Sequence, residues 1–185
     1  AQGDLGQSVR LRRPVFDIIA ESLPRSLALG SVSMALAVLL GVPLGVLAAI
    51  KHGSIWDTIA RILALLGQGA PSFLLGIFLI IVFSVWLRVL PATGADGPAN
   101  YIMPAFTIAW FMGAGVVRLL RSSMLEILGS EYIRTARAKG LSERIVISVH
   151  ALKNAAIPLV TFIGMMLGVI VGASVAVEVV FAWPG

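Results

Sequence analysis

Long apolar stretches separated by short polar intervals make up most of this chain. The first follows Arg25 and contains no charged residue for about 25 positions. A helix rises 1.5 Å per residue, so about 20 apolar residues cross the ~30 Å hydrocarbon core of a bilayer. The pattern predicts an all-α polytopic transmembrane helix bundle in one domain, residues 1–185, with four spans at about 25–50, 62–87, 101–118 and 155–182. The third span is short and is expected to continue as helix beyond Arg118.

Two spans contain polar side chains that are candidates for a solute pathway. In the second span Gln68 lies among Gly67, Gly69 and Pro71, where the helix is expected to loosen and expose polar backbone to a cavity. In the fourth span Glu178 is the only acidic residue. Intramembrane polar groups commonly face a bundle interior, so a plain interhelical hydrogen bond for Gln68, or a hydrated interfacial position for Glu178, is the competing interpretation.

Glycines at four-residue spacing predict close helix packing. Gly41 and Gly45 flank Pro43 in the first span, and the fourth span carries Gly164, Gly168 and Gly172. Small residues at this spacing let two helix backbones approach each other. We expect these faces to contact other helices, and a partner subunit is one possible source for the helix on the fourth span.

Composition assigns the chain to the membrane. Hydrophobic residues make up 58% and charged residues 12% of the 185 positions, against about 45–50% and about 25% in soluble domains. The net charge of +5 does not indicate nucleic acid, because no aromatic-studded basic face accompanies it. The chain has no cysteine, which excludes disulfides and thiolate metal sites.

The distribution of positive charge predicts which side is cytoplasmic. Nine of the 14 lysines and arginines fall in residues 51–61 and 118–153. Cytoplasmic loops carry an excess of these residues, so the loop at about 118–153 is predicted to face the cytoplasm. The arginines at 10–13 oppose this assignment, unless residues 1–24 form an amphipathic helix lying at the interface rather than an ordinary loop.

One long polar interval, residues 130–158, stands out between the third and fourth spans. Ser130 is placed to cap a short helix, Glu131 lies in its first turn, and Arg137 and Lys139 lie near its end. Gly140 suits the left-handed position that follows a helix. A second helix is predicted to start after Ser142 and to carry apolar residues at helical spacing: Ile145, Val146, Val149 and Leu152.

Motifs for catalysis are missing from the sequence. There is no P-loop, no H-E-x-x-H, no nucleophile elbow and no close carboxylate pair within a span. We therefore expect no enzymatic activity, no metal site and no bound cofactor in this chain. If the chain moves a solute uphill, the energy must enter from another protein, and the helix–glycine–helix segment is the natural point of entry.

The segment EYIRTARAKGLSERIVISVHALKNAAIPLVT, residues 131–161, closely resembles the cytosolic EAA loop of the membrane subunits of binding-protein-dependent ABC importers. The similarity is to the dipeptide, oligopeptide and nickel permease family. Stretches outside the loop resemble the same family: GDLGQS at 3–8, RPV at 13–15, LPRSLALG at 23–30, GVPLGVLAA at 41–49 and EVVFAWPG at 178–185.

This resemblance implies a role for the loop as the element that docks on an ATPase. The coupling residues it implies are Glu131, Tyr132, Arg134, Thr135, Ala136, Arg137, Ala138, Lys139, Gly140 and Leu141. The generic loop has Glu-Ala-Ala where this chain has residues 134–136, Arg-Thr-Ala, and Leu-Pro where it has Leu152-Lys153. These departures resemble the B-type member of the two paired permeases.

We expect two kinds of contact with the ATPase. Tyr132, Ala136, Ala138 and Leu141 would supply apolar or small contact area. Arg134, Arg137 and Lys139 would set the register by charge. The alternative is that these cations form only a solvated face retained inside by the charge bias.

The resemblance also implies partners, location and size. The partners are a second permease subunit, one or two ABC ATPase subunits that bind ATP and Mg, an extracytoplasmic binding protein and membrane lipid, with no nucleic acid. The location is the inner or plasma membrane. Family members have six spans, so this chain is expected to lack the first and last of them. Di- or oligopeptides are the expected cargo, with nickel, glutathione or another small solute as alternatives. An ATP-independent channel or secondary carrier, or a membrane scaffold, is the alternative from another class.

Overall fold

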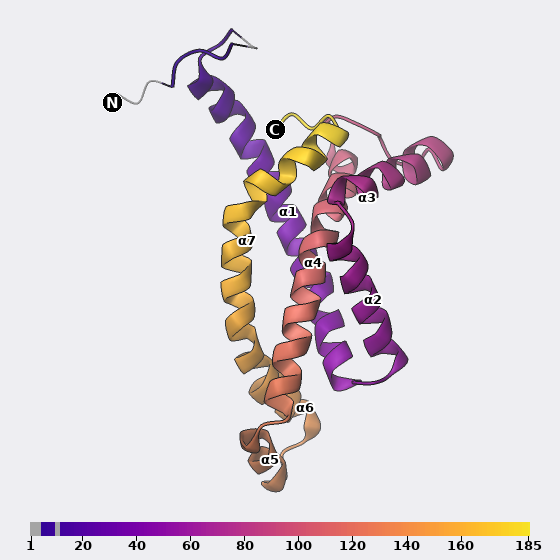
Figure 1. Cartoon of the computed structure of the whole chain (residues 1–185), viewed down its shortest axis with the longest axis vertical. Helices are drawn as coiled ribbons and strands as arrows, with labels where there is room; N and C mark the ends of the chain where they lie inside the picture. Colours follow the sequence, from indigo (N-terminus) through magenta and orange to yellow (C-terminus); the bar gives the residue numbers. More distant parts are fainter. Residues whose placement is uncertain (1–4, 10–11) are drawn as a thin grey trace.

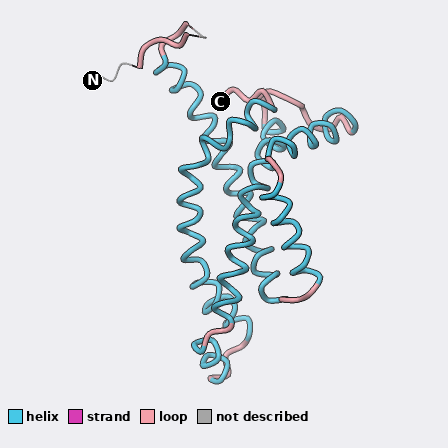
Figure 2. The backbone as a smooth tube through the Cα atoms, in the orientation of Figure 1, coloured by secondary structure: helices cyan, strands magenta, loops and turns pink. Residues whose placement is uncertain are grey.

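The computed structural model describes residues 5–9 and 12–185 of the chain. Helices account for most of this part, and its only β-pairing is an isolated bridge between Gln7 and Pro14. The all-α prediction is thus confirmed (Figure 2). The elements in order are α1 (Val15–Ile50), α2 (Ile55–Gly69), α3 (Ser72–Leu79), the π-helix η1 (Ile80–Trp86), α4 (Pro98–Leu128), α5 (Glu131–Ala138), α6 (Glu143–Ile145), the π-helix η2 (Val146–Ala151) and α7 (Leu152–Val180).

The long helices α1, α4 and α7 lie side by side, with α2 against α1 and α4 (Figure 1). The turn between α1 and α2 and the α5–α6 segment lie toward the same end of this bundle. The segment 181–185 and the connection between η1 and α4 lie at the opposite end. The two segments in which positive charges concentrate, residues 51–61 and the loop after α4, therefore share one end of the molecule.

The spans agree with the sequence in place but not in detail. Among the described residues, three helices are long and apolar enough to cross a membrane, and the total is four if α2 and the α3–η1 unit count as one bent span. The predicted second span at 62–87 is not one continuous helix: α2 begins at Ile55 and the chain bends by 102° after Gly69. Ala70 precedes Pro71 and is extended, with φ −108° and ψ 140°. Proline offers no N–H and disfavours a helical residue before it, so the helix breaks where loosening was predicted.

The helices that contain the first and third predicted spans are longer than those spans. α1 starts ten residues before the predicted span, and neither Pro24 nor Pro43 interrupts it. Residues 15–24 are therefore part of α1 and not of a separate interfacial helix; residues 1–4 and 10–11 of that prediction lie outside the described part. α4 continues to Leu128, as expected from the short third span. The loop predicted at 118–153 is largely helical.

Glycines bring α4 against its neighbours. A Cβ atom added at Gly41 would lie 2.9 Å from Cγ1 of Val116, and one at Gly45 would lie 3.2 Å from Cβ of Leu120. Contacts this short leave no room for a side chain, so the predicted packing role of Gly41 and Gly45 is confirmed for the α1–α4 pair. At Gly164, Gly168 and Gly172 the space within 4 Å is open in the described chain.

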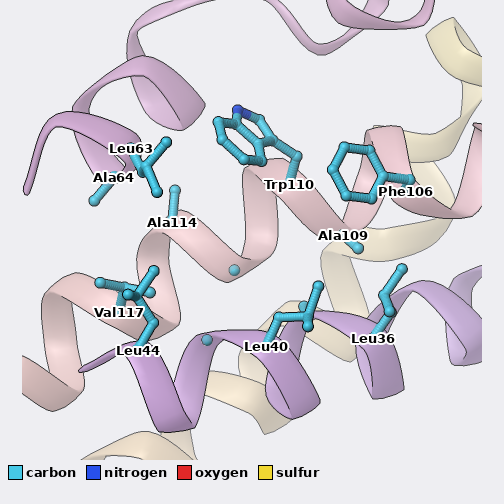
Figure 3. A pocket seen from close by; sticks show the side chains of 13 residues that line it. Leu36, Leu40, Leu44, Leu63, Ala64, Phe106, Ala109, Trp110, Ala114 and Val117 are labelled. Atoms are coloured by element: carbon cyan, nitrogen blue, oxygen red, sulfur yellow. The ribbon is translucent and has the colours of Figure 1, made fainter. Parts of the chain in front are cut away.

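The seam between α2 and α4 depends on a third glycine. A Cβ atom at Gly67 would lie 2.6 Å from Cβ of Ala114 and 3.1 Å from the carbonyl oxygen of Trp110. Beside this seam α1, α2 and α4 enclose a small apolar cavity of about 190 Å³, and Figure 3 shows the Trp110 ring at its side with leucines from α1 and α2 around it. The absence of a side chain at Gly67 therefore lets the backbone of α2 lie directly against α4.

A buried ion pair ties the α1–α2 turn to α4. The side chain of Asp57, in the first turn of α2, is only 1% exposed. Its carboxylate accepts hydrogen bonds from Nε of Arg121 at 2.6 Å, from Nη2 of Arg121 at 2.9 Å and from the backbone N–H of Gly53 at 3.0 Å. His52 Nδ1 lies 3.1 Å from the same carboxylate. The turn and α4 are thereby held together at the end of the bundle where α5 lies.

We predict that Gly67→Ala destabilises the bundle while Gly69→Ala does not. The added methyl group at position 67 must displace Ala114 or the α4 backbone, which costs about 1–3 kcal/mol, whereas the space around Gly69 is open. Thermal unfolding in detergent, followed by helical circular dichroism, measures the difference. Equal midpoints for the two variants would contradict the close α2–α4 seam.

We predict that Asp57→Ala lowers the free energy of unfolding by about 3 kcal/mol, because it leaves the mostly buried Arg121 guanidinium without its partner. The double variant Asp57→Ala/Arg121→Ala should cost less than the sum of the single variants. Glu21→Ala, which breaks the exposed pair with Arg13, is the control and should leave stability unchanged. Additive effects at Asp57 and Arg121 in a denaturation cycle would show that the pair does not couple the two elements.

Candidate functional site: the helix–glycine–helix segment

The segment from Ser130 to Ser142 folds as a short helix ended by a left-handed glycine. α5 spans Glu131–Ala138, and Gly140 has φ +77°. The N–H of Gly140 donates to the carbonyl of Arg137 at 2.9 Å, and the N–H of Leu141 donates to the carbonyl of Ala136 at 3.4 Å. This pair of bonds is a Schellman motif, which satisfies carbonyls that the helix end leaves free. The predicted stop at Gly140 is confirmed.

The start of α5 differs from the prediction in one respect. Ser130 has the extended backbone of an N-cap residue, but its hydroxyl does not bond to the first turn of α5. It donates instead to the carbonyl of Ile127 at 2.7 Å, at the end of α4. Ser130 therefore fastens the tight connection between α4 and α5.

One face of α5 is buried against the rest of the chain. Ile133 is fully buried and Ala136 is 6% exposed. Both belong to an apolar cluster with Met124 of α4 and Val146 of η2. Sequence reasoning did not single out Ile133, although its three-residue spacing from Ala136 marks the apolar stripe of a short amphipathic helix. This cluster is what holds α5 against the bundle.

The predicted contact residues divide into buried and exposed ones. Ala136 packs into the chain's own core, and Leu141 is half-buried in the same cluster. The face that points to solvent instead carries these predicted residues: Glu131, Tyr132, Arg134, Thr135, Arg137, Ala138, Lys139 and Gly140.

Two of the three predicted cations form ion pairs within the chain. Arg134 pairs with Glu131 within α5. Arg137 bonds to Glu143 through Nε at 2.6 Å and Nη2 at 3.2 Å, across the Gly140 turn. The Glu143 carboxylate raises the pKa of the Arg137 guanidinium above its usual value. Within the described residues Lys139 is the predicted cation that has no ion pair.

A hydrogen bond connects α5 to the start of the next helix. The hydroxyl of Tyr132 lies 2.6 Å from Nδ1 of His150 in η2, and the two rings meet edge to face. Tyr132 is nevertheless 46% exposed. His150 was not predicted as part of the site, because only the tertiary structure brings it to Tyr132.

The second helix starts where predicted but turns differently. α6 begins at Glu143 after Ser142, and the chain continues through η2 into α7. Of the apolar residues at helical spacing there, Val146 is fully buried, while Ile145 and Val149 are about half exposed. A π-helix adds residues to the turn, so the spacing that predicts one face in an α-helix does not hold through η2.

The two pathway candidates lie apart from this segment. Gln68 is half-buried beside the bend after α2, and its Nε2 lies so close to α4 that a Cβ atom at Gly115 would be 3.3 Å from it. Glu178 lies near the end of α7, 8% exposed, and accepts a hydrogen bond from the hydroxyl of Ser174 at 2.9 Å. The described residues contain no cluster of histidine and acidic side chains that could hold a metal ion.

Comparison with known proteins identifies the family of this architecture. Residues 41–185 match the family described as "Binding-protein-dependent transport system inner membrane component". The chain is also similar to proteins named "Glutathione transport system permease protein GsiC". It is 44% identical over 184 residues to those of Shigella flexneri serotype 5b (strain 8401) and Escherichia coli (strain K12), and 43% identical to that of Salmonella choleraesuis (strain SC-B67).

Each of these matches covers the whole of this chain but 60% of the relative. The family match extends over all of α2–α7 and the last ten residues of α1, and so includes the helix–glycine–helix segment. The chain therefore belongs to the family of inner-membrane components of binding-protein-dependent transport systems.

Proposed function

We propose that this chain works as a permease subunit of an ATP-driven importer, in which α5 docks on a separate ATPase. The observation that carries the proposal is the placement of α5. It lies at one end of the bundle, holds its apolar face against α4 and η2, and presents a polar face outward. A short helix seated in this way can occupy a groove in a partner while remaining fixed to its own chain.

The contacts between α5 and the bundle can transmit a displacement of α5 to the long helices. Ile133 and Ala136 contact the cluster that contains Met124 of α4 and Val146 at the entry to α7. Arg137 and Tyr132 add polar links to Glu143 and His150 on the same entry segment. A displacement of α5 by an ATPase would therefore move α4 and α7 together, as a rigid-body rocking of the spans.

The proposed partners follow from the family. They are a second permease subunit, one or two ABC ATPases that bind ATP and Mg, and an extracytoplasmic binding protein that delivers the solute. The end of the bundle with α5 would then face the cytoplasm, in agreement with the excess of positive charge there. Within the permease pair we assign this chain to the B-type position, on the basis of Arg134-Thr135-Ala136.

For the cargo we propose a small peptide, with glutathione as the first solute to test. The relatives named above are glutathione permeases, and glutathione is itself a tripeptide. Nickel or another small solute is the alternative cargo. Gln68 and Glu178 are proposed as pathway residues, at the bend after α2 and near the opposite end of α7 respectively.

The decisive experiment is purification of the full-length, affinity-tagged protein from its own membranes, followed by reconstitution with whatever co-purifies. We expect an ABC ATPase and a second permease in the complex, and uptake of glutathione that requires ATP and the binding protein. Recovery of the chain alone or as a homo-oligomer, or solute flux indifferent to ATP, would move the channel or carrier interpretation to first place.

We predict that Gly140→Asp uncouples ATP hydrolysis from uptake without preventing insertion. A side chain at the left-handed position costs about 1 kcal/mol and changes the angle between α5 and α6. Gly129→Asp is the matched control: Gly129 has helical φ −84°, and a side chain there meets only ordinary contacts. The measurements are membrane content, co-purified ATPase and solute taken up per ATP hydrolysed. Normal uptake by Gly140→Asp would refute the hinge role.

A further inference from the structure

Two cavities on one side of the α2–α4 seam meet at Gln68 and Gly69. One, of about 440 Å³, lies at the bend after α2 and reaches Met166 and Ile170 of α7. The other, of about 550 Å³, follows α2 and α4 toward the end where α5 lies. We call the two together the Gln68 cleft.

Positive charge lines the cleft, and none of the described residues that line it is acidic. Its basic residues are Arg61, Arg118 and Arg121, all in the part nearer α5. The charge of Arg121 is balanced by the bidentate bond to Asp57, and Nε of Arg61 lies 3.7 Å from the same carboxylate. Arg118 is exposed and makes no hydrogen bond or ion pair with any described residue. Its charge is therefore available to a ligand.

Further polar groups line the same path. The Gln68 amide makes no hydrogen bond to another described residue, and Gly115 leaves room for it against α4. Arg118 lies one helical turn beyond Gly115 on α4, and Ser122, also in the cleft, lies one turn further. The broken helix places Ser72 and the backbone of 69–71 on the cavity at the bend. Non-helical backbone at membrane depth is tolerated where it lines an aqueous cavity.

We propose that the Gln68 cleft binds the carboxylate of a solute in transit. The Gln68 amide N–H is its first donor, and the Arg118 guanidinium is its charge partner one turn closer to α5. Cations on the walls of a low-dielectric cleft raise the local concentration of anions, and an arginine without a protein partner binds a carboxylate through two parallel N–H donors. The inference rests on the proposed importer function and narrows its cargo to solutes that carry a carboxylate.

The phosphate of an anionic lipid headgroup has the same chemistry, because basic pockets between membrane helices also bind such headgroups. The polar lining of the cavity at the bend after α2 favours a solute over a lipid headgroup as the ligand. Gln68 and Ser72 carry the polar lining up to the bend after α2, away from the basic end of the cleft. A headgroup would explain Arg118 but not these residues.

The first test measures the local potential and does not depend on the cargo. The sequence contains no cysteine, so Ser122→Cys introduces one thiol in residues 1–185 of the assembled complex. Its labelling rates with an anionic and a cationic methanethiosulfonate reagent are compared, with and without Arg118→Gln. Removing one unit charge about 6 Å away should lower the anionic-to-cationic rate ratio about tenfold, and Lys51→Gln should leave the ratio unchanged. No labelling by either reagent, or an unchanged ratio in Arg118→Gln, would overturn the proposal.

The second test measures transport and separates the two sources of the anion. The full complex with its binding protein is reconstituted in phosphatidylcholine vesicles, with and without phosphatidylglycerol, and reduced glutathione is the probe. We expect Arg118→Gln to lower the uptake rate at least fivefold in both lipids, Arg118→Lys to retain most of it and Lys51→Gln to match the wild type. A defect confined to vesicles with phosphatidylglycerol would overturn the solute site in favour of a headgroup.

Uptake by Arg118→Gln equal to that of Lys51→Gln in both lipids would also overturn the site. Absence of ATP-dependent glutathione uptake by the wild type would instead refute the proposed cargo. In that case the labelling ratio at position 122 still decides whether the cleft is aqueous and positive.

Discussion

The architecture depends on how closely the neighbours of α4 can approach it. α4 packs against α1, α2, α3, α7 and η2, and glycines make the closest of these contacts possible: Gly41 and Gly45 from α1, and Gly67 from α2. Apolar side chains gain little by leaving lipid for protein, so helices in a membrane associate mainly through close packing and polar contacts. The glycine contacts therefore set the position of α2, and with it the bend and the cleft beside it.

One polar contact and one apolar contact connect this packed centre to the end where α5 lies. The Asp57–Arg121 pair fixes the α1–α2 turn to α4, while Ile133 and Ala136 seat α5 under α4 and η2. The first contact joins elements far apart in the chain, and the second joins α5 to the helices just before and after it. These contacts fix the α1–α2 turn, α4 and α5 to one another at this end of the bundle.

The sequence was sufficient for features that are decided locally. Apolar length located the spans, Pro71 located the break after α2, and the preference of glycine for positive φ located the end of α5 at Gly140. Each of these follows from the chemistry of a few neighbouring residues. The three-residue spacing of Ile133 and Ala136 is also a local signal, and it indicates the buried face of α5.

Features decided by distant contacts could not be derived in this way. The 102° bend depends on what α3 and η1 pack against, and the Tyr132–His150 bond needs η2 to fold back on α5. The burial of Ala136 follows from the side of α5 that α4 covers. The exposure of Ile145 and Val149 follows from the π-helix, whose presence the spacing of apolar residues does not reveal.

The length of α1 has a consequence for how the protein sits in its membrane. Its 36 residues correspond to about 54 Å at 1.5 Å per residue. Even at a steep tilt of about 40°, such a helix extends about 41 Å along the bilayer normal, against about 30 Å of hydrocarbon. Roughly 10 Å of α1 must therefore stand outside the lipid tails. Glu21 in this part of α1 pairs with Arg13 just before the helix, and the N-terminal part of α1 rises from the membrane surface opposite α5.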